Sequence, residues 1–469
     1  MYECPTCGAG LIFDPKEQML KCQYCNNEYS TEDIERLHLK EAKRKKVDNA
    51  ESYDAIAYKC TQCGATLITT DETIATFCSY CGSSAMLERE KVKEHKPKYV
   101  IPFKKTKEEC IEAYRKKLAK SFFAPENMSE EQQVEKIRGI YMPYWIYTFK
   151  GNGINTTETS RYSKRRGDYV YYKDYKITTN LDAKYSGITH DATSNFSDSL
   201  SECIAPFSIK EKKDFSPTYL TGYYADAEDV DKDMYYKESH EMATADASKK
   251  LSQDAIYRSY NALPYVHMDL ESAEVGLFPV YFLSTKNQKG DRISYAVING
   301  QTGKVAAEIP IDFKKYLIAS FIIAIMIFIC LNLIFTVTPT KVLMLSILFN
   351  IISWIISTIQ LKEICKREED INNEEEKFAE KIEKSDYKTI KKQKMQALKK
   401  SKTYKPIIGL IIAILIIIIN PVSDVYYYSG AILSIVITIW SFYDIIKELN
   451  LLTTRKLPQL EKRGGDENA

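Results

Sequence analysis

The sequence predicts a multidomain chain with two small cysteine-rich modules, a mixed α/β, strand-rich domain and four C-terminal transmembrane helices. Three observations support this fold class. Eight of the 12 cysteines form one pattern that occurs twice, a tyrosine-rich middle region alternates strand-like and helical patterns, and four long apolar runs follow it. The whole chain, 45% hydrophobic and 27% charged, has the composition of a soluble protein because it averages over these unlike parts.

Charge is distributed unevenly along the 469 residues. Residues 1–96 carry 13 Lys/Arg and 16 Asp/Glu, residues 97–312 carry 30 and 31, and residues 313–469 carry 22 and 16. The first two regions are slightly acidic and the third is basic. The net charge of the whole chain is +2, which excludes a chain that is strongly basic throughout.

The N-terminal cysteines occupy two copies of one module. In each copy, 14 residues separate one Cys-x-x-Cys pair from the next, and adding 56 to the numbers of the first copy gives the second. The same shift maps Tyr24 onto Tyr80. Such spacing is typical of a zinc ribbon, in which four thiolates bind one tetrahedral ion. The predicted zinc ligands are Cys4, Cys7, Cys22 and Cys25 in the first module, and Cys60, Cys63, Cys78 and Cys81 in the second.

The residue after each Cys-x-x-Cys pair is expected to take a left-handed backbone conformation. Gly8, Gly64 and Gly82 adopt it without steric cost, and Asn26 is the next most tolerant residue. The 14-residue spacer has room for a β-hairpin, with a turn at Asp14-Pro15 in the first copy. Modules this small cannot bury enough apolar surface to fold alone, so zinc would supply most of their stability, about 10–16 kcal/mol.

Disulfides are the main alternative for these cysteines, and iron in a rubredoxin-like site is another. The chain begins Met-Tyr-Glu-Cys with no basic and apolar leader, so we expect the cysteines to stay in the reducing cytoplasm, where disulfides are rare. All four positions of each set are cysteine, which leaves no open coordination position. We therefore predict two structural Zn²⁺ ions and no catalytic use of the metal.

Between the modules, a helical linker is predicted because Ser30-Thr-Glu-Asp33 forms a capping signal before apolar Ile34 and Leu37. The basic run from Lys43 to Lys46 is interpreted as a solvated helix face, with phosphate contact as the alternative.

The middle region is predicted to be a mixed α/β domain in the cytoplasm. One helix starts at the capping box Thr106-Lys-Glu-Glu109, and a second covers residues 239–260, where alanine or leucine recurs every four residues. Strands are predicted at residues 139–147, 169–179 and 275–283, followed by a hairpin of residues 293–299 and 304–309.

The middle region contains no complete catalytic motif. The sequence from Gly300 to Val305 is similar to a phosphate loop, but its glycine spacing is too short and Val305 stands where Ser or Thr is needed. His240-Glu241 begins like a zinc-protease motif, but Thr244 takes the place of the second histidine. The tyrosines are interpreted as sheet packing, with base stacking as the alternative. We therefore expect no enzyme activity.

Four apolar segments are predicted to cross a membrane. Residues 316–335 and 342–361 each contain 20 residues without a charge, enough for a hydrocarbon core of about 30 Å. Residues 425–443 are also uncharged, and the shorter segment 406–421 is predicted to pair with them across a turn at Asn420-Pro421.

The loops predict a multi-pass cell-membrane protein with both termini in the cytoplasm. Residues 362–405 carry 14 Lys/Arg, whereas the two short loops of the hairpins carry a single lysine. The stretch from Lys388 to Lys405 holds eight lysines and no acid. It is expected to favour anionic lipid by about 1 kcal/mol per charge, and a plain charged helix is the equal alternative.

These patterns give the following predicted organisation. It comprises zinc ribbon 1 (1–29), a helical linker (30–57), zinc ribbon 2 (58–96), the α/β domain (97–312), transmembrane hairpin 1 (313–361), a charged loop (362–405), transmembrane hairpin 2 (406–446) and a cytoplasmic tail (447–469).

The cysteine string, followed by Tyr99-Val-Ile-Pro-Phe103 and Gly139-Ile-Tyr-Met-Pro-Tyr-Trp145, resembles a bacterial family described as TFIIB-type zinc ribbon-containing proteins. Some members are labelled primosomal or superfamily II helicase-like. The likeness covers the ribbons and most of the middle domain, and the Arg463-Gly-Gly-Asp466 tail is similar, whereas Asn26 departs from the usual Gly. The resemblance implies zinc at the eight cysteines and no settled activity. A helicase needs a phosphate loop and two motor domains of about 150 residues each, and the sequence has neither.

Three functions remain as hypotheses. The first is a membrane-anchored binding or scaffold module that faces the cytoplasm and recruits a cytoplasmic protein partner. The second is a membrane-tethered nucleic-acid-binding protein, which the acidic charge of residues 1–96 makes the weaker hypothesis. The third is an unrecognised enzyme or transporter. Against it, the polar side chains of the spans are Asn332, Asn350, Gln360 and hydroxyls, with no charge to mark an ion path.

Overall fold

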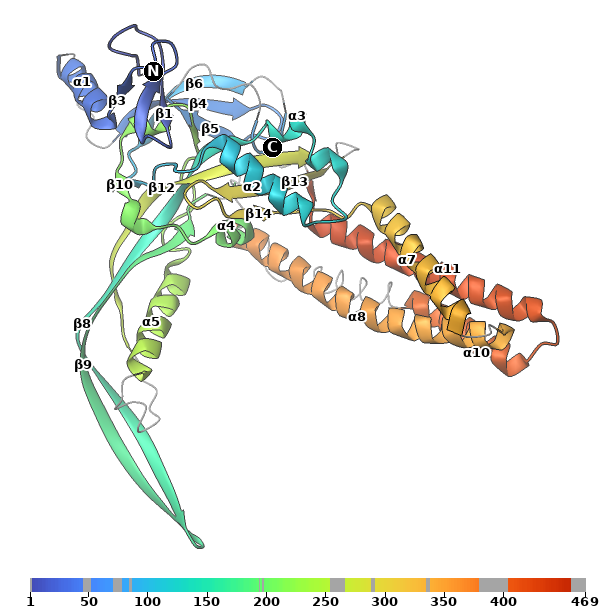
Figure 1. Ribbon diagram of the computed structural model, residues 1–469. Coiled ribbons are helices and arrows are strands. Elements are labelled where there is room, and N and C mark those ends of the chain that lie inside the picture. The colour runs from blue at the N-terminus through green and yellow to red at the C-terminus, as the bar shows by residue number, and fades with distance from the viewer. Residues whose placement is uncertain are drawn as a thin grey trace, which may run out of the picture.

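The computed structural model describes residues 2–44, 52–70, 78–83, 87–193, 195, 198–253, 266–287, 292–334, 338–378 and 404–456. Figure 1 shows a body built from the N-terminal modules and a large sheet, from which a long two-stranded arm and a group of helices extend.

Ribbon 1 contains a small antiparallel sheet of β1 (Leu11–Asp14), β2 (Met19–Cys22) and β3 (Glu28–Tyr29). Phe13 pairs with Leu20, so the predicted hairpin with its turn at Asp14-Pro15 is confirmed. Leu11 and Phe13 are buried and alternate with partly exposed neighbours, because side chains of a strand point to opposite faces in turn.

The described residues of the linker form a helix and then the start of a strand. Helix α1 (Thr31–Arg44) follows ribbon 1 as predicted, but strand β4 (Ser52–Cys60) already begins inside the predicted helical linker. The helix prediction is therefore wrong from Ser52 onward. The reason is long-range pairing: β4 is hydrogen-bonded to both β5 (Thr66–Thr69) and β6 (Leu87–His95), which a local periodicity cannot reveal.

Ribbon 2 shares one sheet with the middle domain. Strand β5 pairs with β11 (Tyr224–Ala225), which runs parallel to β8 (Arg138–Arg166). Over the described residues, this sheet has 12 strands, eight of them in the order β10-β7-β12-β8-β11-β5-β4-β6. Its other members are β7 (Tyr99–Val100), β9 (Tyr169–Asp191), β10 (Lys213–Asp214), β12 (Asp269–Lys286), β13 (Arg292–Asn299), β14 (Val305–Ala307) and β15 (Arg455–Lys456).

Two apolar layers cover the central sheet. Consecutive residues of β8 and β12 alternate between them: Tyr141 and Leu277 join one cluster, and Met142 and Phe278 join the other. Ribbon 1 and helix α2 (Lys107–Ala119) contribute to the first cluster. The cysteines of ribbon 2 and helix α4 (Asp198–Ile204) contribute to the second. Ribbon 1 thus packs against one face of the sheet, whereas the cysteines of ribbon 2 join the cluster on the other face.

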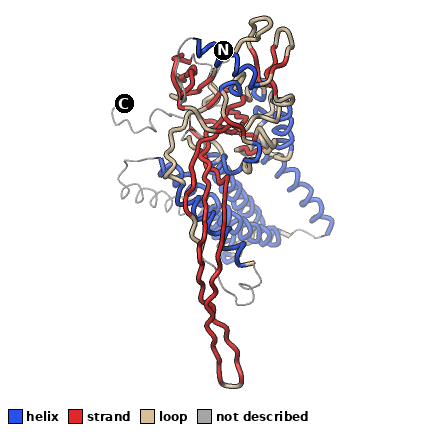
Figure 2. Tube along the Cα trace, turned by 90° about the vertical axis from the view of Figure 1, so that its left-hand side faces the viewer, coloured by secondary structure: helices blue, strands red, loops and turns tan. Residues whose placement is uncertain are grey.

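The tyrosine-rich strands continue beyond the body as an arm. Strand β12 pairs with β8 only as far as Lys150, whereas β8 and β9 remain paired out to Arg166 and Tyr169. Figures 1 and 2 show this two-stranded ribbon projecting alone from the body. Helix α5 (Tyr236–Ser252) packs at the base of the arm. It confirms the predicted second helix up to Ser252, and residues 254–265 lie outside the described part.

Four helices close the chain: α7 (Phe313–Ile334), α8 (Pro339–Phe378), α10 (Tyr404–Ile419) and α11 (Asp424–Leu452). Within the described residues, two stretches are long and apolar enough to cross a membrane, Pro339–Ile364 and Asp424–Leu452. A shorter apolar helix covers Lys405–Ile419. Of the four spans that the sequence predicts, the described chain thus gives two candidates by length and composition.

The last helix is hydrogen-bonded to the sheet body. Asn450 exchanges two hydrogen bonds of 2.8 Å with the backbone of Ile311, just before α7. Arg292 of β13 donates to the hydroxyl of Thr454 (2.7 Å), and β15 pairs with the start of β13. The beginning of α7 and the end of α11 therefore lie together at the body.

Candidate metal centres

The structure brings all eight predicted cysteines together in two groups, within each of which the four Sγ atoms lie within 4.8 Å of one another. The Sγ–Sγ distance is 3.6 Å for Cys4–Cys25 and 3.5 Å for Cys7–Cys22. In the second group it is 3.7 Å for Cys60–Cys81 and 3.6 Å for Cys63–Cys78. We call the groups site 1 and site 2.

These distances discriminate between the alternatives for the cysteines. A disulfide requires about 2.05 Å between sulfurs, and all eight cysteines are free. A tetrahedral zinc ion with Zn–S bonds of about 2.3 Å places its ligands about 3.8 Å apart, close to the distances found. The geometry therefore fits a four-thiolate metal ion in each site. It does not distinguish zinc from iron, so the identity of the metal stays a prediction.

The four Cys-x-x-Cys loops share one backbone geometry. In the first loop, the amide of Gly8 donates to the carbonyl of Cys4 (2.9 Å), and the amide of Cys4 donates to Ala9 (2.7 Å). The same pair of bonds recurs in the loops that start at Cys22, Cys60 and Cys78. The predicted left-handed residues are confirmed, with φ of 75° at Gly8, 57° at Asn26, 77° at Gly64 and 64° at Gly82.

Backbone amides of these loops also point at sulfur and favour its charged form. The amide of Cys25 lowers the pKa of Cys22 although burial of the sulfur acts to raise it, and the amide of Tyr24 adds to the lowering. Hydrogen bonds with Cys63 and Cys78, together with the amide of Ser83, hold the pKa of Cys81 at about 2. Hydrogen bonds between the sulfurs have the opposite effect on their partners, and the pKa of Cys7, Cys25, Cys63 and Cys78 is raised. Metal binding requires thiolates, so a bound cation would be needed to hold all four sulfurs of a site in the charged form.

Site 1 is attached to the body through its hairpin. The amide of Phe13 donates to the carbonyl of Thr221 (3.1 Å), and Gln18 Nε2 donates to the carbonyl of Phe103 (2.7 Å). The backbone approaches closely here, because a Cβ on Gly222 would lie 2.6 Å from Ile12 Cγ2. The opposite end of the module remains accessible, and Cys7 is exposed.

Site 2 is enclosed, with all four cysteines buried. Tyr80 lies between two of its ligands, and its hydroxyl donates to Asp226 Oδ2 at 2.6 Å. Thr193 donates to the same oxygen at 2.9 Å, and the amide of Ala227 donates to Oδ1 at 3.0 Å. Burial raises the pKa of Asp226 to about 6, and the bonds from Tyr80 and Thr193 limit the rise. This network ties the second Cys-x-x-Cys loop to β11 and its neighbours.

Sequence reasoning missed the anchoring role of Asp226 and Tyr80. The repeat aligns Tyr80 with Tyr24, yet Tyr24 is 82% exposed and Tyr80 only 1%. Asp226 lies far from the cysteines in sequence and belongs to no motif. The tyrosine shared by both copies could have indicated a structural role, but the sequence does not show which of the two tyrosines is buried.

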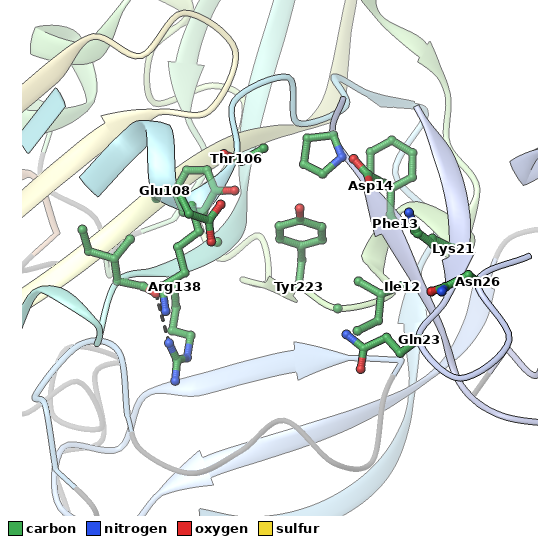
Figure 3. A pocket seen from close by; sticks show the side chains of 16 residues that line it. Ile12, Phe13, Asp14, Lys21, Gln23, Asn26, Thr106, Glu108, Arg138 and Tyr223 are labelled. Carbon is green, nitrogen blue, oxygen red and sulfur yellow. Dashed lines mark hydrogen bonds between the residues drawn. The ribbon is translucent and has the colours of Figure 1, made fainter. Parts of the chain in front are cut away.

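A cavity of about 1040 Å³ lies between ribbon 1 and the sheet body (Figure 3). The β1–β2 hairpin forms one wall, and the start of α2 and the first residues of β8 form the other. Burial, together with the nearby Arg138, lowers the pKa of Lys107 in this second wall. The volume of the cavity suits a small ligand or a peptide segment. Side chains that face it in Figure 3 include Ile12, Asp14, Lys21, Glu108, Arg138 and Tyr223.

Other sequence-based expectations lie partly or wholly outside the described residues. These are the lipid interaction from Lys388 to Lys405, the tail from Arg463 to Asp466 and the second half of the basic run from Lys43 to Lys46.

The incomplete zinc-protease motif lies on a helix. His240 and Thr244 belong to α5, and His240 contacts the carbonyl of Met268 (2.9 Å).

The chain is similar to a protein of known sequence. A Bacillus subtilis (strain 168) protein described as "Uncharacterized protein YdjG" is 29% identical over 322 residues, which cover 67% of this chain and 91% of that protein. No family model matches the chain. No solved structure matches it either. The resemblance to TFIIB-type zinc ribbon-containing proteins therefore stays a prediction.

Proposed function

We propose that this chain is a membrane-anchored protein whose zinc-ribbon and sheet body faces the cytoplasm and binds a cytoplasmic protein partner. The observation that carries the proposal is the attachment of site 1, which is fixed to the body by its hairpin and leaves a metal-stabilised loop with Tyr24 exposed. Exposed aromatic side chains on a rigid support are typical of protein interfaces. The proposal assigns no catalytic step to the chain.

Structural zinc is part of the proposal. Each site has four cysteine ligands and no fifth protein group is needed, which is the closed arrangement of a structural ion. The residues that would hold the ions are the two sets of four cysteines. Bound zinc would fix loops that have few apolar contacts of their own, most of all in ribbon 1.

The helices support membrane anchoring through the distribution of their side chains. Between α8, α10 and α11, Asn350 hydrogen-bonds to Ser434, and Thr438 donates to Asn350 Oδ1 at 2.8 Å, all three side chains being buried. On the outer surface, apolar residues such as Ile355 and Ile418 are exposed. Polar contacts inside and apolar residues outside are expected for helices packed in lipid.

We extend this proposal to four spans with both termini in the cytoplasm. Helix α7 has 22 residues, and its charges are the two lysines at its start. The shorter helix α10 packs against α11 with Lys405 and Asp444 paired at one end. The body contacts both the start of α7 and the end of α11, which requires an even number of crossings. The basic residues of the loop 362–405 favour its cytoplasmic placement.

The partner is expected to contact the exposed loop of ribbon 1 and the adjacent cavity. The test is affinity capture of the full-length chain from membranes, with metal content measured on the same sample. The Tyr24→Ala variant should lose the partner, while Phe122→Ala, a control with 78% of an aromatic side chain exposed on another part of the body, should retain it.

Two results would contradict the proposal. One is recovery of the chain in the soluble fraction after alkaline extraction of membranes. The other is a set of captured proteins that is identical for the parent chain and the Tyr24→Ala variant. Fewer than two metal ions per chain would refute its structural-zinc component.

A further inference from the structure

The tip of the β8–β9 arm exposes aromatic and basic side chains together. Every residue from Ser163 to Asp174 is exposed, including Tyr169 at 73% and Tyr171 at 59%. A two-stranded ribbon is marginally stable in water by itself, and exposed tyrosines add to the cost of leaving it uncovered. The tip therefore presents a surface suited to a contact.

The strand register sorts these side chains onto two faces. Arg166 lies opposite Tyr169, and Lys164 lies opposite Tyr171. Directly paired residues share a face, and so do residues two apart along a strand. One face therefore carries three cations and two tyrosines and no acidic residue. We call it the basic face of the tip; it consists of Lys164, Arg166, Tyr169, Tyr171 and Lys173.

The opposite face differs in charge. It carries Ser163, Arg165, Val170, Tyr172 and Asp174, so its charges balance. Arg165 is also engaged locally, because its Nε donates to the carbonyl of Gly167 at 3.2 Å. Within the described part of the chain, no side chain of the basic face takes part in an ion pair.

The arm and the helices extend from the body in different directions, but the end of the arm bends toward the helices. In Figure 1 the arm runs downward, whereas α8 and α11 run mainly to the right, and the lower end of the arm curves toward the side on which these helices lie. In Figure 2 the arm again runs downward, and the helices lie behind it. The tip is therefore displaced toward the side on which these helices would cross a membrane.

We propose that the basic face of the arm tip binds the anionic headgroups of the membrane in which the helices are anchored. This inference rests on the proposed membrane anchoring. Tyrosine is enriched at membrane–water interfaces, and Lys and Arg near a membrane surface are attracted to anionic lipid. The arm then acts as a lateral support that sets the orientation of the ribbon-bearing body above the bilayer.

The size of the tip favours lipid over nucleic acid. A duplex-binding protein typically neutralises six to ten phosphates, whereas the basic face offers three cations. Headgroups in a bilayer are separate and mobile, so a few cations can bind them individually.

The test uses the full-length chain in lipid nanodiscs and trypsin, which cleaves after the exposed Arg165 and Arg166. Cleavage at the tip is followed by mass spectrometry in discs of phosphatidylglycerol and in discs of phosphatidylcholine. Protection on the order of tenfold is expected in the anionic discs at low salt, and it should disappear at high salt.

Two variants with equal changes in charge locate the contact. Lys164→Gln/Lys173→Gln removes two charges from the basic face and should abolish the protection. Ser163→Glu/Val170→Glu adds two negative charges to the opposite face and should leave most of the protection intact. Circular dichroism of each variant should match the parent chain, which excludes unfolding as the cause.

Other results would overturn the inference. Equal cleavage in both kinds of disc, with the chain incorporated, would refute the lipid contact but leave membrane anchoring intact. Protection by added single-stranded RNA but not by anionic lipid would make the arm a nucleic-acid-binding element. Failure of the chain to enter discs at all would refute the proposed anchoring, and the inference with it.

Discussion

The two copies of the cysteine module have the same ligands, spacing and loop geometry but different surroundings. Site 1 is attached by one hairpin and exposes Cys7 and Tyr24. Site 2 shares the central sheet, and its Tyr80 is hydrogen-bonded to the buried Asp226. The repeat therefore specifies the metal site, whereas contacts with the rest of the chain determine whether that site is buried in the body or exposed at its surface.

Loss of a ligand should separate the two sites most clearly. Cys81→Ser should prevent folding of the sheet body, because a structural zinc contributes about 10–16 kcal/mol and whole domains are stable by only about 5–15 kcal/mol. Cys25→Ser should release one metal ion and leave the body folded. Thermal unfolding and metal content of the purified variants measure both effects. A folded body in Cys81→Ser would show that site 2 is dispensable.

The pH dependence of stability should reflect the anchor of site 2. The pKa of Asp226 is raised from an ordinary value of 3.8 to about 6, so the folded state binds its proton more tightly than the unfolded state. Stability from this group is complete below pH 3.8, falls as pH rises toward 6, and is constant above. The total loss in the free energy of unfolding between these pH limits is about 3 kcal/mol.

The Asp226→Asn variant should lose this dependence of stability on pH. The readout is the difference between the urea-unfolding free energies of parent and variant at several pH values from 4 to 7, since metal release at low pH affects both chains alike. An unchanged difference across this range would mean that Asp226 titrates normally in the folded protein.

A matched pair of hydroxyl deletions compares the modules directly. Tyr80→Phe leaves the buried Asp226 with one donor fewer and should destabilise the body by about 1–3 kcal/mol. Tyr24→Phe changes an exposed side chain and should cost less than about 0.5 kcal/mol. Chemical denaturation of the full-length chain measures both values. Equal costs would contradict the difference in burial between the two copies.

The local parts of this structure could be predicted from the sequence because they depend on short-range chemistry. Cysteine spacing indicated both metal sites, and the residues after each pair indicated the left-handed turns. The capping box at Thr106 was also predictable, and both of its hydrogen bonds are present. Tyrosine-rich and apolar stretches indicated strands of the central sheet.

Long-range features could not be predicted. The strand that starts at Ser52 forms because partners from other segments pair with it, and no local pattern distinguishes it from the end of a helix. The role of Asp226 depends on a contact with Tyr80, 146 residues away. The length of the β8–β9 arm beyond the sheet depends on where β12 begins. These features arise from tertiary packing.

Stepwise removal of metal compares the two sites within one molecule. A chelator is added to the full-length chain, and native mass spectrometry counts the ions while near-ultraviolet circular dichroism follows the body. We expect two zinc ions per chain, release of the first from the exposed site 1 with the body still folded, and release of the second only as the body unfolds. Release of both ions in one step, or alkylation of the site 2 cysteines before Cys7, would contradict this difference between the sites.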